Sequence, residues 1–201
     1  MTPLLALLIA YILGAIPFGY LLVKWKTGSD VRAAGSGNIG ATNVLRTTGM
    51  VAGVVTLVLD IAKGYAAVWI ADILTNHDPL WMSAAALAVM AGHAYPVFLK
   101  FQGGKAVASF VGAFFRLTPL PMLAVLVVFV GVVAWTRQIS LGSILAAGTF
   151  PLAVWLILQP PLPITVASLI AGIFIIYRHR GNIRRLHEGS EHALTFGAGR
   201  S

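Results

Sequence analysis

The chain has 201 residues, of which 58% are hydrophobic and only 10% are charged, and its formal net charge is +8. A soluble domain carries about 25% charged residues, so this composition excludes an ordinary water-soluble protein and favours a chain that folds in a lipid bilayer. The absence of cysteine excludes disulfides, thiolate nucleophiles and zinc–thiolate sites.

Seven apolar segments follow one another along the chain, and a bilayer-spanning helix takes about 20 such residues, fewer inside a bundle. They cover residues 3–23, 50–74, 80–99, 106–115, 121–135, 139–158 and 162–177. Arg116 and the prolines of TPLP at 118–121 separate the fourth from the fifth, because proline breaks helices. The predicted fold class is all-α, a polytopic transmembrane bundle of seven helices. The alternative is five full crossings with a re-entrant pair over 106–135.

The basic residues indicate the orientation of these helices. With seven crossings and the N-terminus outside, every lysine and arginine except Lys63 and Arg116 falls on the cytoplasmic side, as the positive-inside rule requires. The C-terminus is then cytoplasmic. The first segment has no basic region before it and no clear cleavage site, so we interpret it as a retained span rather than a signal peptide.

The first polar loop reads GSGNIGATNVLR and contains a literal G-x-G-x-x-G pattern. A dinucleotide-binding turn is excluded, because no buried strand precedes it. Glycines such as Gly37 and Gly40 still let backbone N–H groups approach an anion closely. Further donors come from the side chains of Ser36, Asn38, Thr42, Asn43 and Arg46. The loop therefore predicts a phosphate-sized anion site, or else a plain connector between two spans.

The second polar loop, KFQGGKAVAS at 100–109, places Gly103, Gly104 and Lys105 where a helix is predicted to begin. Two glycines, a lysine and a helix N-terminus are the parts of an anion site, although a positively charged anchor loop is the simpler alternative. His93 precedes the loop near the end of the third span. A histidine in a membrane span is either a packed, hydrogen-bonded group or a functional one.

The third polar segment, YRHRGNIRRLHEGSEHAL at 177–194, is rich in arginine. Such a tail is commonly a topology signal or a contact to anionic lipid. That interpretation does not account for His179 and Asn182, which are three residues apart and could face the same site as the two loops. Within the second span, Asp60 and Lys63 share a helix face and are expected to neutralise each other.

Four motifs occur in order along most of the chain: SGNIGATNVLR at 36–46, LDIAKG at 59–64, GHAYPVFLKFQGGKAVA at 92–108 and HRGNIRRLHEGSE at 179–191. On these motifs the chain resembles the bacterial acyl-phosphate:glycerol-3-phosphate acyltransferases. The chain also lacks the H-x-x-x-x-D motif of other glycerol-3-phosphate acyltransferases. One departure is Ala108-Ser109, where a small residue followed by threonine is common in the family.

The resemblance implies an integral membrane enzyme of phospholipid biosynthesis. It would transfer a fatty acyl group from acyl phosphate to the 1-hydroxyl of glycerol 3-phosphate, giving lysophosphatidic acid and inorganic phosphate. Residues 1–194 would form a single transmembrane catalytic domain, with 195–201 a disordered tail or a cloning scar. We expect no cofactor, no metal and no nucleic acid. The expected partners are both substrates, membrane lipids and the soluble enzyme that supplies acyl phosphate, at the inner membrane with the active site facing the cytoplasm.

The resemblance also suggests roles for individual residues. The acyl-phosphate head and carbonyl oxygen are assigned to Ser36, Gly37, Asn38, Thr42 and Asn43. The phosphate of glycerol 3-phosphate is assigned to Gly103, Gly104 and Lys105, while Gly40 and Arg46 belong to the same phosphate-binding set and Arg46 could serve either substrate. His179 and Asn182 are placed near the attacking hydroxyl, and Asp60, Lys63 and Glu191 are structural, Glu191 by pairing with a tail arginine.

The proton acceptor is open between His93, His179 and the departing phosphate itself. Direct attack by the hydroxyl is favoured over an acyl-enzyme on Ser36, because no Ser-His-acid spacing supports the latter. Two other classes remain as alternatives: a transporter or channel for an anionic solute, and a structural membrane subunit. Both are disfavoured, because the polar residues gather on one face rather than along a path, and a structural subunit leaves the donor-rich loops unexplained.

Overall fold

The computed structural model describes residues 1–194, and over that range only helices and no strands are found, as predicted from the sequence. The tail predicted at 195–201 lies outside the described residues. The α-helices are α1 (Thr2–Ala15), α2 (Phe18–Thr27), α3 (Ala41–Thr48), α4 (Met50–Leu74), α5 (Pro79–Ala94), α6 (Val107–Leu117), α7 (Pro119–Thr136), α8 (Ile139–Leu158), α9 (Leu162–Arg178) and α10 (Arg180–His187). Two short 3₁₀ helices, Val31–Ala33 and Val97–Leu99, lie in the connecting loops.

The first predicted span is broken into α1 and α2, contrary to the single helix expected over 3–23. The break lies at Ile16 and Pro17, where Ile16 has extended backbone angles (φ −63°, ψ 114°). Proline has no N–H and disfavours the helical region for the residue before it. The Lys63 ammonium of α4 donates to the carbonyl oxygen of Ile16 at 2.8 Å, so the break is stabilised from inside the bundle.

The first polar loop does not run directly into the second span, because a separate helix lies between them. Thr42 and Asn43 lie inside this helix, α3, which runs from Ala41 to Thr48 and is followed by Gly49. Gly49 has φ of 101°, a conformation that glycine adopts at little steric cost. The chain turns there and α4 starts at Met50.

Each of the seven predicted apolar segments is helical, but only some of these helices meet the length for a full crossing. Within residues 1–194, five segments are long and apolar enough by themselves: Thr2–Thr27, Met50–Leu74, Pro79–Leu99, Pro119–Thr136 and Ile139–Leu158. The pair α9 and α10, bent by 56°, gives a sixth, and α6 is a shorter apolar helix. The seven-crossing count and the orientation stay predictions.

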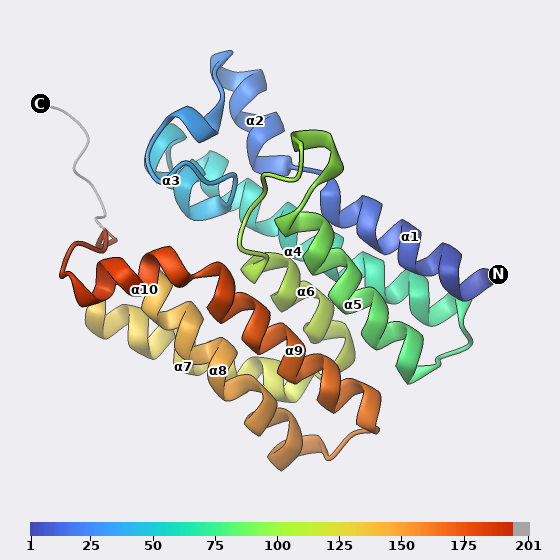
Figure 1. Cartoon of the computed structure of the whole chain (residues 1–201). Coiled ribbons are helices and arrows are strands. Elements are labelled where there is room, and N and C mark those ends of the chain that lie inside the picture. The colour runs from blue at the N-terminus through green and yellow to red at the C-terminus, as the bar shows by residue number, and fades with distance from the viewer. Residues whose placement is uncertain (195–201) are drawn as a thin grey trace, which may run out of the picture.

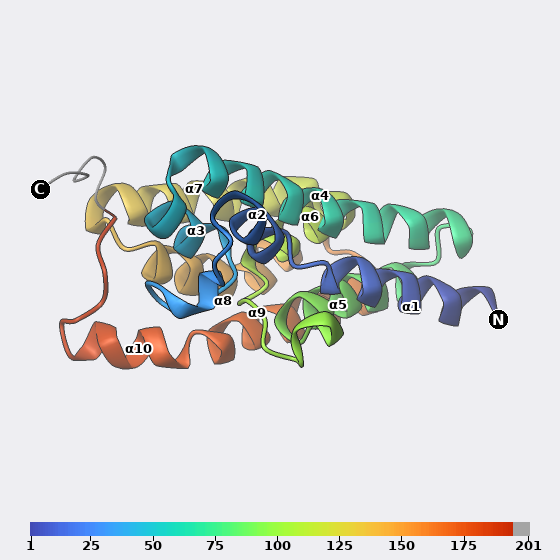
Figure 2. The ribbon, with the colours of Figure 1, turned by 90° about the horizontal axis from the view of Figure 1, so that it is seen from above.

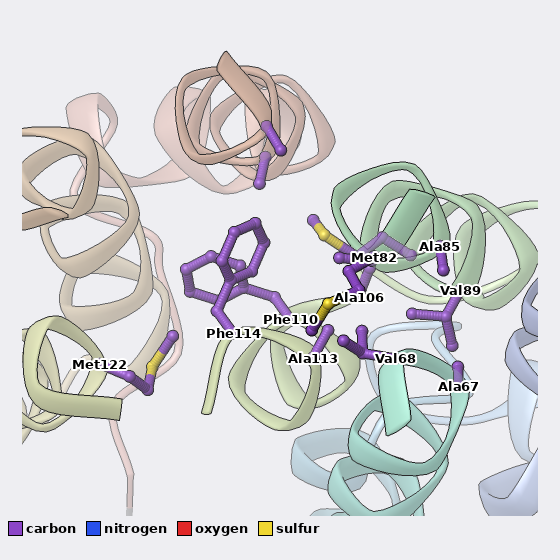
Figure 3. Packing of buried hydrophobic residues seen from close by; sticks show 14 of the residues in the cluster. Ala67, Val68, Met82, Ala85, Val89, Ala106, Phe110, Ala113, Phe114 and Met122 are labelled. Carbon is purple, nitrogen blue, oxygen red and sulfur yellow. The ribbon is translucent and has the colours of Figure 1, made fainter. Parts of the chain in front are cut away.

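The polar loops gather at one end of the bundle, the loop end, which holds residues 28–49, 95–106 and α10. Figures 1 and 2 show α3 and α10 toward this end and the N-terminus toward the other. The apolar core runs between the helices, with α6 packed against α4 and α5 as well as α7 and α9. In Figure 3, Phe110 and Phe114 project together from α6, and their rings each lie 4.9 Å from the ring of Phe150 of α8.

Candidate active site

The three polar segments predicted to meet do converge, at the loop end of the bundle. There they enclose a cavity of about 290 Å³, which we call the anion cavity. Its lining comes from the first loop, the second loop, the end of α9 and α10: Ser36, Asn38, Lys105, Arg178, Arg180, Gly181, Asn182 and Arg185. Among the described residues no carboxylate lines this cavity, whereas four cationic side chains do, so its walls suit a negatively charged ligand.

A second cavity of about 630 Å³ shares Arg178 with the anion cavity. It is lined by Asp30, Arg32, Ala33, Gly37, Phe101, Gln102, Gly103 and Arg178. Asp30 and Arg32 form an ion pair at 2.7 Å on its wall. Gly37, one of the predicted phosphate-binding residues, therefore faces this second cavity.

Asn43 holds the first loop in shape. Its side-chain oxygen accepts a hydrogen bond from the Ser36 backbone N–H at 2.8 Å, and its side-chain nitrogen lies within 2.8–3.1 Å of the carbonyl oxygens of Val31, Ala34 and Asn38. Only 2% of Asn43 is exposed. Asn43 thus lies beneath the loop, and Ser36 and Asn38 are the loop residues that reach the anion cavity.

The second loop is held through its backbone. Gly103 donates its N–H to the carbonyl of Ala94 at 3.2 Å, and Gly104 donates to the carbonyl of His93 at 3.1 Å. A side chain on Gly104 would overlap the imidazole of His93, so glycine is required for this close approach. These two amides are engaged within the protein, and Lys105 is the group through which the loop reaches the anion cavity.

Lys105 belongs to a chain of polar contacts that links the second loop to α10 and to the segment after it. Its ammonium donates to the side-chain oxygen of Asn182 at 2.5 Å, and the Asn182 nitrogen donates to Glu191 at 2.7 Å. Arg185 donates to the other Glu191 oxygen at 2.8 Å. Burial lowers the pKa of Lys105 to about 8; Glu191 opposes this, while the neighbouring arginines, among them Arg185 and Arg46, add to it. The Lys105 ammonium is therefore a cation that an incoming anion would stabilise.

The segment after α10 returns across the loop end and carries Glu191. Arg46 of α3 donates to the carbonyl of His192 at 3.3 Å, and the Leu194 N–H donates to the carbonyl of Arg137 at 2.6 Å. Partial burial of the Glu191 carboxyl works against ionisation, but hydrogen bonds from Asn182 and Arg185 outweigh it and hold the pKa of Glu191 below its usual value. Glu191 is thus a fixed anion among surplus cations.

Comparison with known proteins agrees with this geometry. The model of the glycerol-3-phosphate acyltransferase family matches residues 4–189. A glycerol-3-phosphate acyltransferase of Geobacter sulfurreducens is 49% identical over 183 residues, which cover 91% of this chain and 93% of that protein. The chain belongs to the glycerol-3-phosphate acyltransferase family.

Solved structures of the same family have the same fold. The crystal structure of PlsY (YgiH), an integral membrane glycerol 3-phosphate acyltransferase, in its glycerol 3-phosphate form is 39% identical, with a TM-score of 0.92, over 97% of this chain and 96% of that one. Its lysophosphatidic acid form is 37% identical, with a TM-score of 0.89 and the same coverage. This chain is therefore an integral membrane acyltransferase.

The two histidines predicted to act in this acyltransferase lie apart from the cavity linings. His93 is 3% exposed; its Nδ1 lies 3.3 Å from the Ser109 hydroxyl and 3.6 Å from a carboxylate oxygen of Asp60. His179 is 2% exposed, and its Nδ1 lies 2.8 Å from the carbonyl oxygen of Ile175. Of the predicted pair on the tail, Asn182 reaches the anion cavity and His179 packs behind it.

Asp60 and Lys63 form an ion pair at 2.7 Å, with each side chain 3% exposed. Together with His93 they make up what we call the inner charge cluster, between α4 and α5. Within the cluster, the Asp60 carboxylate is paired with the Lys63 ammonium, and buried charges need such a partner.

Sequence reasoning missed some arginines of the site, because it took the tail arginines as a topology signal. Arg178, Arg180 and Arg185 all line the anion cavity. A signal was present: Arg178, Asn182 and Arg185 are spaced by four and three residues, which places them on one helix face. Although a 56° bend separates α9 from α10, all three side chains line the anion cavity together with Lys105 of the second loop.

Proposed function

We propose that this acyltransferase moves a fatty acyl group from acyl phosphate to the 1-hydroxyl of glycerol 3-phosphate, and so makes lysophosphatidic acid and inorganic phosphate. The observation that carries the proposal is the anion cavity, with four cationic side chains around about 290 Å³. Both proposed substrates carry a phosphate. The two matching PlsY structures are described as glycerol 3-phosphate and lysophosphatidic acid forms, which supports the same acceptor and product here.

The two phosphates would be held by different walls of the anion cavity. Lys105 binds the phosphate of glycerol 3-phosphate, with Arg185 and Asn182 beside it. Ser36 and Asn38, on the first loop, face the acyl-phosphate head and its carbonyl oxygen. Arg46 adds positive charge from α3. Gly40, Thr42 and Asn43 belong to the start of α3 and to the support of the first loop, so their contribution is to the shape of the site.

The reaction needs little covalent chemistry from the protein. The glycerol hydroxyl oxygen attacks the acyl carbonyl carbon, the carbon–oxygen bond to phosphate breaks, and phosphate leaves with the bonding electron pair. The hydroxyl proton passes to the departing phosphate, whose second pKa lies near neutrality. This route fits an anion cavity whose lining, within residues 1–194, contains no histidine. The protein accelerates the reaction by holding two mutually repelling anions in line and by screening their charge.

The distribution of basic residues supports a location in the bacterial inner membrane, with the loop end facing the cytoplasm. The anion cavity would then open toward the side where glycerol 3-phosphate is found. A soluble enzyme that makes acyl phosphate would deliver its product at the same face, and membrane lipids would receive the lysophosphatidic acid. Residues 1–194 would act as one transmembrane catalytic domain in phospholipid biosynthesis.

The test uses the purified protein in detergent or lipid, with glycerol 3-phosphate and palmitoyl phosphate, and measures release of phosphate and formation of lysophosphatidic acid. Parallel reactions replace the donor with palmitoyl-CoA or palmitoyl acyl carrier protein. Product with acyl phosphate alone is the expected result. Product with either thioester and none with acyl phosphate would contradict the proposed donor. No product with any donor, from protein that melts cooperatively, would contradict the proposed reaction.

A further inference from the structure

Arg178, the last residue of α9, makes three contacts with the segment that carries Lys105. One guanidinium nitrogen donates to the carbonyl oxygen of Gly104 at 2.8 Å and to that of Gly103 at 3.3 Å. The guanidinium carbon lies 4.9 Å from the centre of the Tyr95 ring. A planar cation that is both stacked and hydrogen-bonded has little freedom to move. Arg178 therefore holds the carbonyl side of the second loop in a fixed place.

The amide side of the same loop is held by α5. Gly103 and Gly104 donate their N–H groups to Ala94 and His93, at the end of that helix. Because their amides bond to α5 and their carbonyls bond to Arg178, the backbone of the two glycines is hydrogen-bonded on both sides. Neither glycine can rotate its peptide planes without breaking at least one of these bonds.

Lys105 directly follows Gly103 and Gly104, and its side chain contacts α10, the helix that continues from α9. Its ammonium donates to Asn182 of α10, four residues beyond Arg178. The α9–α10 pair thus touches the second loop at two consecutive points, through Arg178 and through Asn182. The backbone is fixed at the first point, and the side chain is directed at the second.

We propose that Arg178 is a positioning residue, which holds the Gly103–Gly104 backbone so that the Lys105 ammonium is directed into the anion cavity before substrate arrives. What Lys105 then binds rests on the proposed function. A lysine ammonium sits on a flexible four-carbon stem, and fixing such a side chain only on binding costs affinity. By fixing the backbone in advance, Arg178 lowers that cost.

The test compares Arg178→Lys with the wild type. Lysine keeps the positive charge, but it has no planar group that could stack on Tyr95 while it reaches the two carbonyl oxygens. Brief labelling with an amine-reactive reagent, read by mass spectrometry, gives the labelling of Lys105 relative to the exposed Lys100 of the same loop. We expect this ratio to rise about fivefold in Arg178→Lys, which corresponds to the loss of about one hydrogen bond. An unchanged ratio would overturn the proposal.

A kinetic measurement adds a second readout. Arg178→Lys is expected to raise KM for glycerol 3-phosphate about tenfold with little change in kcat, because a misplaced lysine weakens ground-state and transition-state binding alike. Arg184→Ala is the matched control: Arg184 is an α10 arginine whose side chain is 81% exposed and pairs only with Glu188 within the described residues. If Arg178→Lys kept KM as close to the wild-type value as Arg184→Ala does, the positive charge at position 178 alone would suffice. The proposal would then be wrong.

The two readouts separate this proposal from the proposed function. Labelling needs no substrate, so a raised Lys105 ratio would support the positioning role even if wild-type protein made no product from acyl phosphate. Failure of the proposed function would instead appear as absence of product in the wild type. Arg178→Ala serves as a more severe variant, and thermal melting of all variants in detergent shows that the compared proteins are folded.

Discussion

Two groups of charged side chains in this bundle, the inner charge cluster and the lining of the anion cavity, differ in burial and in how their charges are balanced. The inner charge cluster pairs Asp60 with Lys63 at 2.7 Å and adds His93, and its side chains are almost completely enclosed. At the anion cavity, Lys105 and three arginines form part of the lining, and the Glu191 carboxylate lies behind Asn182 and pairs with Arg185. In the first group the buried acid has a basic partner, whereas the second group has surplus positive charge and an open space beside it.

The difference shows how a membrane protein separates charges that support the fold from charges that bind a ligand. A buried charge without a partner is costly, so the inner charge cluster is stable only as a set. Surplus cations are tolerated at the loop end because the cavity admits water and because Glu191 offsets part of the charge. An anionic substrate in the anion cavity would neutralise its surplus positive charge.

The largest expected effect is a loss of stability when the Asp60–Lys63 ion pair of the inner charge cluster is broken. Lys63→Met removes the ammonium partner of the buried Asp60 carboxylate and the bond to the Ile16 carbonyl, so the free energy of unfolding should fall by about 3–5 kcal/mol. Equilibrium unfolding in mixed micelles measures this. The double variant Asp60→Leu/Lys63→Met should recover much of the loss. If the double variant were as unstable as the sum of both single ones, the ion pair would not explain the effect.

The next largest expected effect is a loss of activity when Lys105 is removed from the anion cavity. Lys105→Ala should lower kcat/KM for glycerol 3-phosphate about a hundredfold, because a hydrogen bond to a charged group contributes about 1.5–3 kcal/mol, with thermal stability nearly unchanged. Initial rates of lysophosphatidic acid formation measure this, with Arg184→Ala as the control that also removes one cation. Equal losses in the two variants would mean that net charge, and not the position of Lys105, matters.

A smaller effect on stability and on KM is expected at Gly104, which lies between the inner charge cluster and Lys105. Gly104 packs against the His93 ring, and His93 belongs to the inner charge cluster. Gly104→Ala should force one of them to move, at a cost of about 1–3 kcal/mol in stability, and should raise KM for glycerol 3-phosphate as Lys105 is displaced. Melting curves and initial rates test both effects together. A loss of stability without any change in KM would show that the loop does not transmit the displacement to the site.

The smallest effect concerns pH and has opposite signs for activity and stability. Because the pKa of Lys105 is lowered to about 8 in the fold, against an ordinary value of 10.5, the ammonium is lost as pH rises above 8. Turnover at limiting glycerol 3-phosphate should then fall with rising pH, toward the level of Lys105→Ala as its lower limit. Between pH 8 and 10.5 the unfolded chain binds the extra proton, so the substrate-free protein should gain stability with rising pH.

Both pH trends should be absent from Lys105→Ala, which has no ammonium to titrate at this position. Rates and melting temperatures measured from pH 7 to 10.5 in the wild type and this variant provide the comparison. If the variant lost activity over the same range with the same steepness, another group would be responsible.

Much of the fold was predictable from the sequence, because hydropathy reports burial in lipid directly. All seven apolar segments are helical, and the glycine-rich loops and the tail meet at one end. The break at Ile16–Pro17 and the separate helix α3 were not predicted. A single proline near the middle of an apolar run looks tolerable in sequence, and whether the freed carbonyl finds a partner such as Lys63 depends on a residue 47 positions away.

Composition and motif order by themselves determined that this is an all-helical membrane protein of the glycerol-3-phosphate acyltransferase family, and they predicted phosphate-sized sites in its polar loops. Only the tertiary structure decided which donors line the anion cavity. The amides of Gly103 and Gly104 bond to α5, Asn43 bonds to its own loop, and Arg178, Asn182 and Arg185 turn toward Lys105. The physical reason is that every backbone or side-chain donor can be satisfied inside the protein or by a ligand, and only the packing of distant segments fixes which of the two occurs.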